Sequence, residues 1–335
     1  MPWAGLPDFF LQPLKVGRSI VESIKDEDFD VTIGFNFPSP WIVSSVPTLK
    51  IWYCQEPTVL LYGSITQREF DPYRAGNLIQ ASVRKMYRDH DRRTVSKIDA
   101  LVSNSNFTSN LVKTIYGQVS SVDHLGVDPD LYKPIEGRLR KEFGFENDRI
   151  VLIAARLFPV KCVGDIILAT KEIMKNDKHL KTIICGTGPD ESRLKTMTRE
   201  LGLSSHVLFW GDVLQVKMPA HYAMADVIVN LSMYEPFGLI PVEAMACGKP
   251  IVVYDSGGPS ETVEDGVTGV KVKPRDIGAL SRSISTILQD GSLAKQMGER
   301  GRARVLANYT WNLTAKRLLE SIRLASQRCH GSDAL

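Results

Sequence analysis

Short apolar runs rich in β-branched residues alternate with helix-like patterns along most of this chain of 335 residues. The strand-like runs fall at 30–35, 49–54, 100–103, 150–155, 181–185, 207–210, 227–231 and 251–254. Amphipathic, helix-like stretches lie between them, among them 164–175, 190–201, 241–247 and 277–288. This alternation predicts right-handed βαβ units and parallel sheets covered by helices on both faces. The expected fold class is therefore α/β.

The chain is long enough for two domains of ordinary size. A polar segment at 133–147 precedes a new apolar run, so we expect an N-terminal domain over 1–145 and a second domain over 146–308. The second domain has the strands of a complete doubly wound unit. The first has fewer, and we expect it to be truncated at its start. A helical stretch at 309–328 is expected to pack back towards the first domain.

The composition excludes several classes of protein. Hydrophobic residues make up 43% and charged residues 24%, as in ordinary globular proteins. A net charge of +3 is too small for a dedicated nucleic-acid binder. No apolar run approaches the ~20 residues that cross a bilayer, and the first residues do not form a signal peptide. Scattered cysteines without a C-x-x-C pair indicate free thiols. We expect a cytoplasmic protein with no nucleic-acid partner.

The most informative stretch begins at Glu235 and reads EPFGLIPVEAMACGKP. It follows a strand-like run and opens a predicted helix, whose first turn suits Pro241. Gly238 allows a ligand to approach the backbone closely. The N–H groups of Phe237, Gly238 and Leu239 would then point outward at a helix N-terminus, which binds phosphate through its donors and its dipole.

Two carboxylates in this stretch have different tasks available. Glu235 precedes the helix, where it could accept hydrogen bonds from sugar hydroxyls. Glu243 is expected in the first helical turn, where it could accept from a ribose diol. The two do not share a helix face, so they do not form a general acid/base pair. The plain alternative is that Glu243 complements the helix dipole and Glu235 is solvated.

This stretch resembles the E-x7-E signature of the retaining glycosyltransferases of family 4, which are relatives of glycogen synthase and sucrose synthase. Further segments resemble other motifs of the family in the same order: an R-x4-K motif at 156–161, a glycine turn at 186–189, the strand before the base pocket at 207–211, the loop at 256–269 and the start of the final helix at 309–311. The resemblance implies a GT-B fold. In this fold two Rossmann-like doubly wound domains face each other across a cleft, and the second holds most of the donor.

The resemblance implies a hexosyltransferase that uses a nucleoside-diphosphate sugar, with no metal and no cofactor. Arg156 and Lys161 follow a predicted strand, at the edge where doubly wound sheets bind ligands. Two cations there would stabilise the charge that gathers on the departing diphosphate, in place of a metal. The plain alternative is two surface cations. The implied donor-binding set is Arg156, Lys161, Gly186, Gly188, Gly211, Phe237, Gly238, Leu239 and Glu243.

The first domain departs from the family at one informative position. Residues 53–57, YCQEP, resemble the family's His-Glu-Pro segment, whose histidine contacts the donor sugar. Gln55 stands at that position, and glutamine cannot take a proton at neutral pH. In the front-face mechanism that the resemblance implies, the donor phosphate takes the acceptor's proton. Gln55 therefore remains a candidate for positioning the sugar, and the candidate catalytic set is Glu235, Arg156, Lys161 and Gln55.

Two alternatives to an active hexosyltransferase stay open at this point. One is a catalytically inactive nucleotide-sugar-binding module with a degenerate first domain, which Gln55 and the short first domain favour. The other is a different GT-B enzyme, such as a sugar epimerase or a phosphorylase. Nucleotide binding without sugar transfer would distinguish the first of these from a transferase.

A basic helical stretch at 84–97 has two interpretations. Its Lys and Arg side chains are diluted by Asp89 and Asp91, so a solvated face is the plain one. The functional one is a peripheral contact with the inner face of an anionic membrane, where lipid-linked acceptors reside. The expected partners are a nucleoside-diphosphate sugar donor and an acceptor glycan or lipid-linked acceptor.

Overall fold

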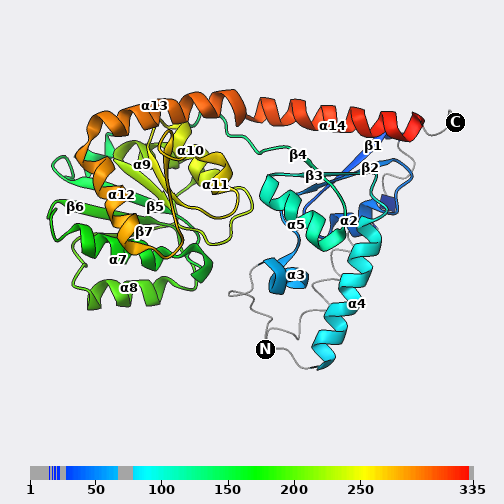
Figure 1. Ribbon diagram of the computed structural model, residues 1–335, viewed down its shortest axis with the longest axis horizontal. Helices are drawn as coiled ribbons and strands as arrows, with labels where there is room; N and C mark the ends of the chain where they lie inside the picture. The colour runs from blue at the N-terminus through cyan, green and yellow to red at the C-terminus, as the bar shows by residue number, and fades with distance from the viewer. Residues whose placement is uncertain are drawn as a thin grey trace. The chain divides into compact units, whose positions relative to one another are not determined.

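The computed structural model describes residues 28–66 and 78–331, together with a few residues between 15 and 22. The chain divides into two compact units, called unit 1 and unit 2 below. Unit 1 comprises the chain up to His124 and the segment from Ala315 onward, and unit 2 comprises the residues from Leu125 to Thr314. Each unit contains one parallel sheet (Figure 1).

Unit 2 is built on a parallel sheet of six strands in the order β10-β9-β8-β5-β6-β7. Its strands are β5 (Arg149–Ala154), β6 (Leu180–Cys185), β7 (Val207–Gly211), β8 (Val227–Asn230), β9 (Ile251–Tyr254) and β10 (Gly269–Val272). The sequence predicted the first five of these to within one residue. These strands are buried on both faces, which makes them near-continuous apolar runs. The short β10 was missed.

Helices cover both faces of this sheet, because successive side chains along each strand point to opposite faces. The face that bears Val151 and Ile153 packs against α7, α8 and α12, whereas the face that bears Ile150 and Leu152 packs against α9, α10 and α13 (Figure 1). The helical segments of the unit are α6 (Leu139–Glu142), η1 (Pro159–Lys161), α7 (Val163–Ile173), α8 (Glu191–Glu200), η2 (Gln215–Lys217), α9 (Met218–Met224), α10 (Leu239–Ala246), α11 (Pro259–Thr262), α12 (Ile277–Gln289) and α13 (Gly291–Asn308).

The strand order of unit 2 reverses beside β5. The chain runs outward from β5 through β6 and β7, and then returns to pair β8 with the other side of β5. The loops that follow β5 and β8 therefore flank a topological switch point at the carboxyl edge of the sheet. Doubly wound sheets bind their ligands at this point.

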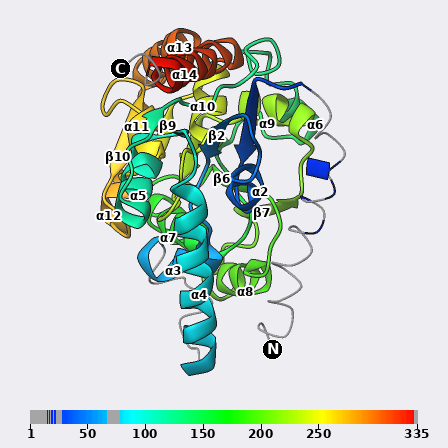
Figure 2. The same ribbon diagram turned by 90° about the vertical axis from the view of Figure 1, so that its right-hand side faces the viewer.

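Unit 1 contains four parallel strands in the order β1-β2-β3-β4 among the residues that are described. They are β1 (Val31–Phe35), β2 (Leu49–Cys54), β3 (Ala100–Ser103) and β4 (Ser121–Val122). Its helices are α2 (Ser39–Val43), α3 (Val59–Thr66), α4 (Leu78–Val95), α5 (Asn106–Tyr116) and the later part of α14 (Trp311–Gly331). The long cyan helix of Figures 1 and 2 is α4.

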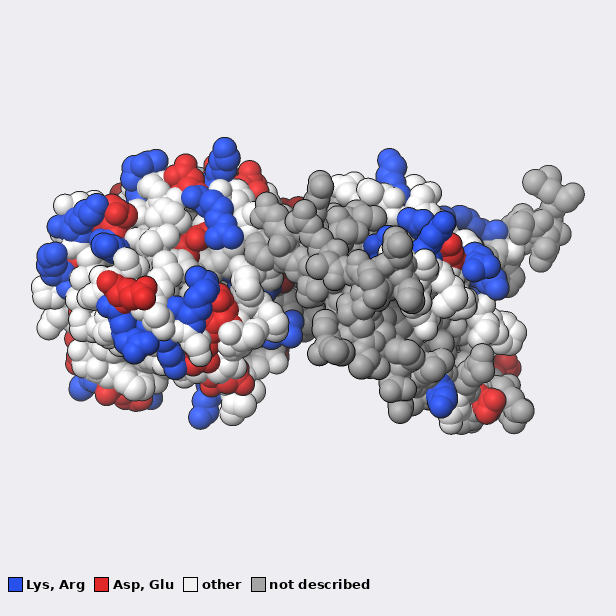
Figure 3. All heavy atoms as spheres, turned by 90° about the horizontal axis from the view of Figure 1, so that it is seen from below, with Lys and Arg blue, Asp and Glu red and all other residues white. Residues whose placement is uncertain are grey.

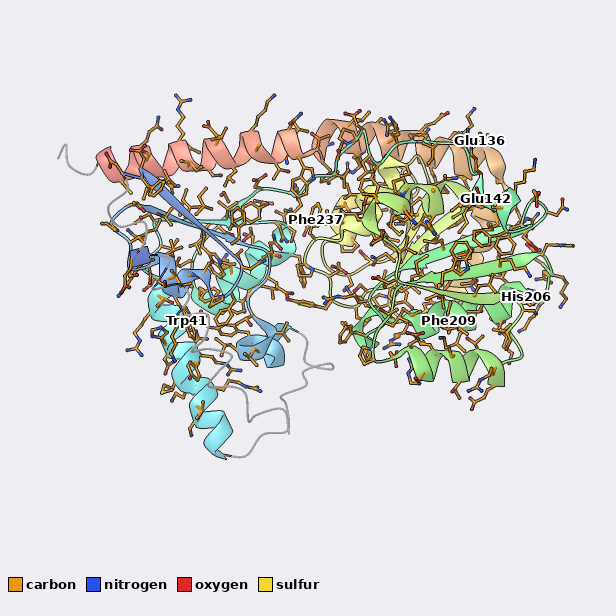
Figure 4. The ribbon with its side chains drawn as sticks, turned by 180° about the vertical axis from the view of Figure 1, so that it is seen from behind. Trp41, Glu136, Glu142, His206, Phe209 and Phe237 are labelled. Carbon is orange, nitrogen blue, oxygen red and sulfur yellow. The ribbon has the colours of Figure 1, made fainter. Side chains whose placement is uncertain are left out.

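A buried carboxylate joins four helices of unit 1. Asp91 of α4 is 1% exposed and accepts hydrogen bonds from the indole of Trp41 on α2 (2.6 Å) and from the hydroxyls of Tyr62 on α3 and Tyr116 on α5 (both 2.8 Å). Trp41 lies beside α4 in Figure 4. Burial raises the pKa of Asp91, and the three donors offset part of that rise. The carboxylate is thus a fully bonded cross-link within the core.

A second buried carboxylate connects β4 to the last helix. The side chain of Asp123 follows β4, is 0% exposed, and has its Oδ1 atom 3.7 Å from Nη1 of Arg317 on α14. Burial raises the pKa of Asp123 to about 6, and Arg317 offsets part of the rise. This pair ties the later part of α14 to the sheet of unit 1.

The raised pKa of Asp123 makes the stability of unit 1 fall as the pH rises. The pKa is about 3.9 in an unfolded chain and about 6 in the folded one. Between these values the folded state binds more protons, so the contribution is fully present below about pH 4 and is lost as the pH rises to about 6. The asparagine of Asp123→Asn cannot titrate. As the pH rises from about 4.5 to about 7.5, we therefore expect the free energy of unfolding of unit 1 in the variant to rise relative to the wild type by about 1–3 kcal/mol.

Hydrogen exchange of the β2 and β3 amides at the two pH values measures this gain, because it reports the opening of unit 1 separately from that of unit 2. The substitution Asp91→Asn is unsuitable as a control, since three side chains donate hydrogen bonds to the carboxylate of Asp91. A difference between variant and wild type that stays the same at both pH values would contradict the assignment to Asp123.

Candidate functional site

The loops after β5 and β6 pack backbone against backbone at the carboxyl edge of unit 2. A Cβ atom at Gly186, whose φ is +123°, would lie 1.9 Å from the carbonyl oxygen of Ala155. A Cβ atom at Gly188 would lie 2.5 Å from the carbonyl oxygen of Leu157. Only glycine fits these positions without moving the β5 loop. Both glycines, expected from the sequence to bind the donor, thus hold the loop that carries the two predicted cations.

The loops after β8 and β9 make an equivalent contact. A Cβ atom at Gly257 would lie 2.4 Å from the carbonyl oxygen of Glu235, and one at Gly258 would lie 2.4 Å from Cα of Phe237. The N–H of Gly258 also donates to the carbonyl of Glu235 at 2.8 Å. The sequence showed these glycines only as part of a loop motif. Their task of fixing the segment before α10 depends on tertiary contacts that no local pattern reveals.

An ion pair links the β5 loop to the β8 loop. The ammonium of Lys161, at the end of η1, binds the carboxylate of Glu235. Their side chains are 20% and 23% exposed. The structure therefore brings together two residues that the sequence assigned to the site, at the switch point of the sheet. An ammonium has three donors and a carboxylate has several lone pairs, so both groups keep capacity for a ligand.

Arg156 lies in the same loop as Lys161 and is exposed. Its guanidinium stands over the ring of Phe158, 5.6 Å from the ring centroid. Stacking on an aromatic ring restrains the cation and leaves its N–H edge available for hydrogen bonds. The β5 loop thus presents two cations, one stacked and one ion-paired.

The N-terminus of α10 faces the same edge. Gly238 is its N-cap at φ +85°, without a side-chain cap, and the helix begins at Leu239. The first N–H groups of a helix have no partner within the helix, so this end offers donors and the positive end of the dipole. The ring of Phe237, labelled in Figure 4, is 2% exposed and packs against Tyr309 at a centroid distance of 6.1 Å. Phe237 therefore has only its backbone to offer a ligand.

Glu243 lies in the second turn of α10 rather than in the first, which corrects the sequence prediction. The helix starts at Leu239, two residues before Pro241. The carboxylate is 6% exposed, and its Oε2 atom accepts a hydrogen bond of 2.7 Å from the hydroxyl of Tyr222 on α9. Burial raises the pKa of Glu243, and the hydroxyls of Tyr222 and Tyr132 offset part of the rise. Neither tyrosine was identified from the sequence.

The loop after β7 completes this edge of the sheet. Gly211 ends β7 with φ +68°, and its carbonyl accepts the N–H of Gly186 at 2.6 Å. Three of the four glycines expected to bind the donor, Gly186, Gly188 and Gly211, therefore belong to adjacent loops. Beyond Gly211, the side chains of Leu214 and Val216 are 64% and 69% exposed. The loop thus places apolar surface next to the position where the sequence predicted the base pocket.

Gln55 belongs to unit 1, where it directly follows β2. Its Oε1 atom accepts from the side-chain amide of Asn36 at 3.3 Å, and its backbone carbonyl accepts from the hydroxyl of Thr108 at 3.3 Å. These bonds hold Gln55 at the carboxyl edge of the unit 1 sheet, beside the ends of β1 and β3. All the other predicted site residues belong to unit 2.

Metal ligands, surface charge and membrane-spanning helices are the other features of the described residues that bear on binding. Within the described ranges, no group of three or more His, Cys, Asp or Glu side chains converges as metal ligands do. Basic and acidic side chains are interspersed over the face of unit 2 that Figure 3 shows. None of the described helices is long and apolar enough to cross a bilayer.

Known proteins similar to this chain are glycosyltransferases. Residues 136–304, about half of the chain, match the model of the family described as glycosyl transferases group 1. The GDP-mannose-dependent alpha-(1-6)-phosphatidylinositol monomannoside mannosyltransferase of Mycolicibacterium smegmatis is 29% identical over 307 residues, which cover 84% of this chain and 80% of that protein. The D-inositol 3-phosphate glycosyltransferase of Nocardia farcinica is 29% identical over 257 residues, which cover 73% of this chain and 56% of that protein.

Two solved structures share the fold. HepE of Anabaena in complex with UDP has a TM-score of 0.79 at 20% identity, over 92% of this chain and 82% of HepE. Sucrose-phosphate synthase from Thermosynechococcus elongatus has a TM-score of 0.76 at 22% identity, over 92% of this chain and 77% of the synthase. At these identities the likeness establishes the fold alone. It confirms the α/β fold of the GT-B type that the sequence predicted.

Proposed function

The chain belongs to the group 1 glycosyl transferases, and we propose that it transfers a hexose from a nucleoside-diphosphate sugar to an acceptor hydroxyl, with retention of configuration and without a metal ion. One observation carries this proposal. Lys161, Glu235 and the N-terminus of α10 converge at the switch point of the unit 2 sheet. They offer a cation and backbone donors to a diphosphate, and a carboxylate to a sugar.

The diphosphate is the part of the donor for which this edge is best equipped. Breaking the glycosidic bond leaves an additional negative charge on the diphosphate. Arg156, Lys161 and the dipole of α10 are fixed before the ligand arrives, so they stabilise that charge without reorganising. Interactions that strengthen as the charge develops raise the rate, because they favour the transition state over the bound donor. The same groups supply the charge neutralisation that a metal would otherwise give.

Retention follows from a front-face reaction at the anomeric carbon. The acceptor oxygen forms its bond to this carbon while the bond from the carbon to the phosphate oxygen breaks on the same face. The acceptor's proton passes to that phosphate oxygen, so the protein need not supply a base. Gln55 fits this scheme as a sugar-positioning residue, because an amide forms hydrogen bonds without taking a proton. Glu235 would accept from a hydroxyl of the sugar.

The names of the relatives suggest a particular donor and acceptor. The relative from Mycolicibacterium smegmatis is named for GDP-mannose and phosphatidylinositol monomannoside, and that from Nocardia farcinica for inositol 3-phosphate. We therefore propose mannose from GDP-mannose as the transferred sugar and an inositol-containing lipid as the acceptor. In unit 2 the exposed Leu214 and Val216 would contact the base, and Glu243 would accept from the ribose.

A lipid acceptor would require contact with the inner face of a membrane, and α4 is the element that would make it. Arg88 and Arg92 donate to backbone carbonyls of unit 1 at 2.5 and 3.0 Å, so these two cations have a structural task. Lys85, Arg93 and Lys97 are exposed along and just beyond the same helix. Arg88 and Arg92 thus have a structural task that neither sequence interpretation included, and the three exposed cations are the ones we propose for the membrane contact.

A second candidate function is binding of a nucleotide sugar without transfer. Gln55 favours it, because its Oε1 atom is already bound to Asn36 and its side chain cannot act as a base. The donor site of unit 2 would be the same in both cases. Turnover is therefore the property that separates them.

The proposed reaction predicts turnover with a defined stereochemistry. Incubation with GDP-mannose and a phosphatidylinositol-based acceptor is expected to give an α-linked mannoside, because retention preserves the α configuration of the donor. Proton NMR of the product reads the anomeric configuration directly. A β-linked product would refute the front-face reaction. Donor binding with no product from any hexose donor would favour the second candidate.

The proposed diphosphate contacts predict a loss of nucleotide affinity when Lys161 is removed. Lys161→Ala is expected to weaken binding of a nucleoside diphosphate by about 1.5–3 kcal/mol, because one charge-assisted hydrogen bond is lost. This corresponds to roughly tenfold to a hundredfold in Kd. Calorimetric titration measures the change, and an excess of chelator is expected to leave it unaltered.

A matched control for this titration is Lys171→Ala. Lys171 is an exposed lysine in the last turn of α7, at the opposite end of that helix from Lys161. The substitution Lys171→Ala removes the same charge from unit 2 without altering the site, so the affinity for a nucleoside diphosphate should stay at the wild-type value. Equal affinities for Lys161→Ala and the wild type, or binding that a chelator abolishes, would count against metal-independent diphosphate binding.

Charge reversal on α4 tests the proposed membrane contact. Lys85→Glu combined with Arg93→Glu should reduce co-sedimentation with vesicles that contain anionic lipid, since each basic residue near such a surface contributes about 1 kcal/mol. Vesicles of neutral phosphatidylcholine should bind neither protein. Retention of the double variant on anionic vesicles at the wild-type level would assign α4 to a solvated face.

A further inference from the structure

The carboxylate of Glu243 is more constrained than a ligand-binding group on a helix surface would be. It is 6% exposed, and its Oε2 atom takes a 2.7 Å hydrogen bond from Tyr222, which is 0% exposed. The two residues come from neighbouring helices, α10 and α9, on the same face of the sheet. A buried carboxylate is costly unless it is hydrogen-bonded, so this bond fixes both the position and the rotation of the group.

A second tyrosine faces the same carboxylate. Tyr132 is 2% exposed, and its ring lies 6.4 Å from that of Tyr222, centroid to centroid. Its hydroxyl is buried. It lowers the pKa of Glu243, as the hydroxyl of Tyr222 does. Both tyrosines thus act on the charge of Glu243, and the 2.7 Å hydrogen bond from Tyr222 is the contact that fixes its position.

We propose that Tyr222 is a positioning residue that holds Oε2 of Glu243 and directs Oε1 at the ribose diol of the donor nucleotide. The site thereby selects ribonucleotides over deoxyribonucleotides. This inference rests on the proposed function, because it requires a nucleotide in unit 2. Tyr132 has the supporting task, since its buried ring packs beside that of Tyr222.

The flexibility of the glutamate side chain is the physical reason why a positioning hydrogen bond would matter. Its torsions leave the carboxylate several orientations, and freezing them on binding costs entropy. With Oε2 already occupied, the lone pairs of Oε1 have one direction before the nucleotide arrives. Burial raises the pKa of Glu243, and the hydroxyls of both tyrosines offset part of that rise. Pre-organisation of this kind adds to affinity by lowering the cost of ordering.

The test compares ligands that differ by one hydroxyl. Calorimetric titrations of GDP, 2′-deoxy-GDP and 3′-deoxy-GDP give the discrimination of each protein as a ratio of Kd values. For the wild type we expect roughly tenfold weaker binding of at least one deoxy analogue, the effect of losing a hydrogen bond to a charged group. In Tyr222→Phe this ratio should fall to about twofold, mainly through weaker binding of GDP itself.

Tyr254→Phe is the matched control. The hydroxyl of Tyr254 donates to Asp165 at 2.6 Å, and the residue is 0% exposed on the opposite face of the same sheet. This variant therefore loses an equivalent buried tyrosine–carboxylate bond in the same unit. A general loss of stability would alter both variants alike, whereas positioning of Glu243 alters the ratio in Tyr222→Phe alone. Tyr132→Phe is expected to give a smaller fall in the ratio.

The outcomes separate this inference from the function on which it rests. Binding of GDP with the same discrimination in the wild type and in Tyr222→Phe overturns the positioning role and leaves the proposed function intact. Unchanged discrimination in Glu243→Gln overturns the placement of the ribose at this carboxylate. If the wild type binds no nucleoside diphosphate at all, both the proposed function and the inference are wrong.

Discussion

Backbone contact between neighbouring loops at the carboxyl edge of unit 2 determines where the site residues lie. The β6 loop touches the β5 loop at Gly186 and Gly188, and the β9 loop touches the β8 loop at Gly257 and Gly258. In each case a Cβ atom would come within 2.5 Å of backbone in the other loop. Contacts this close leave little room for loop movement, so the side chains carried by these loops inherit fixed positions.

The parts of the fold that the sequence predicted are those in which local pattern and tertiary environment agree. Strands such as β5 and β9 are buried on both faces, and their apolar runs identify them. Strand β4 has only two residues, and β10 is as long as β9 but reads GVKV, which is not a continuous apolar run. The start of α10 was placed too late, because Pro241 marks a first helical turn without stating which position of that turn it occupies.

The site was predictable as a set of residues but not as a set of contacts. The motifs identified Lys161 and Glu235 separately, and their ion pair spans 74 positions of the chain. Tyr222 lies 21 positions before Glu243, in a helix whose own pattern marks it only as a core residue. Such contacts depend on how helices and loops pack across a sheet. No periodicity in a single sequence encodes that packing.

The two carboxylates of the site are each partnered before any ligand binds, and this shapes how the site would respond to a nucleotide sugar. Because Glu235 neutralises Lys161, the attraction for a diphosphate in the resting site comes mainly from Arg156 and the dipole of α10. Lys161 has donors left for a phosphate, and their interaction with it would strengthen as charge develops there.

The contribution of Lys161 would therefore be larger in the transition state than in the bound donor, which is the condition for an interaction to raise the rate. Glu243 differs, because its partner is a neutral hydroxyl and the ribose that it would accept from does not change during transfer. Its interaction would be equally strong before and during the reaction. The pair of Glu235 and Lys161 would thus serve turnover. The pair of Glu243 and Tyr222 would serve affinity and the choice of nucleotide.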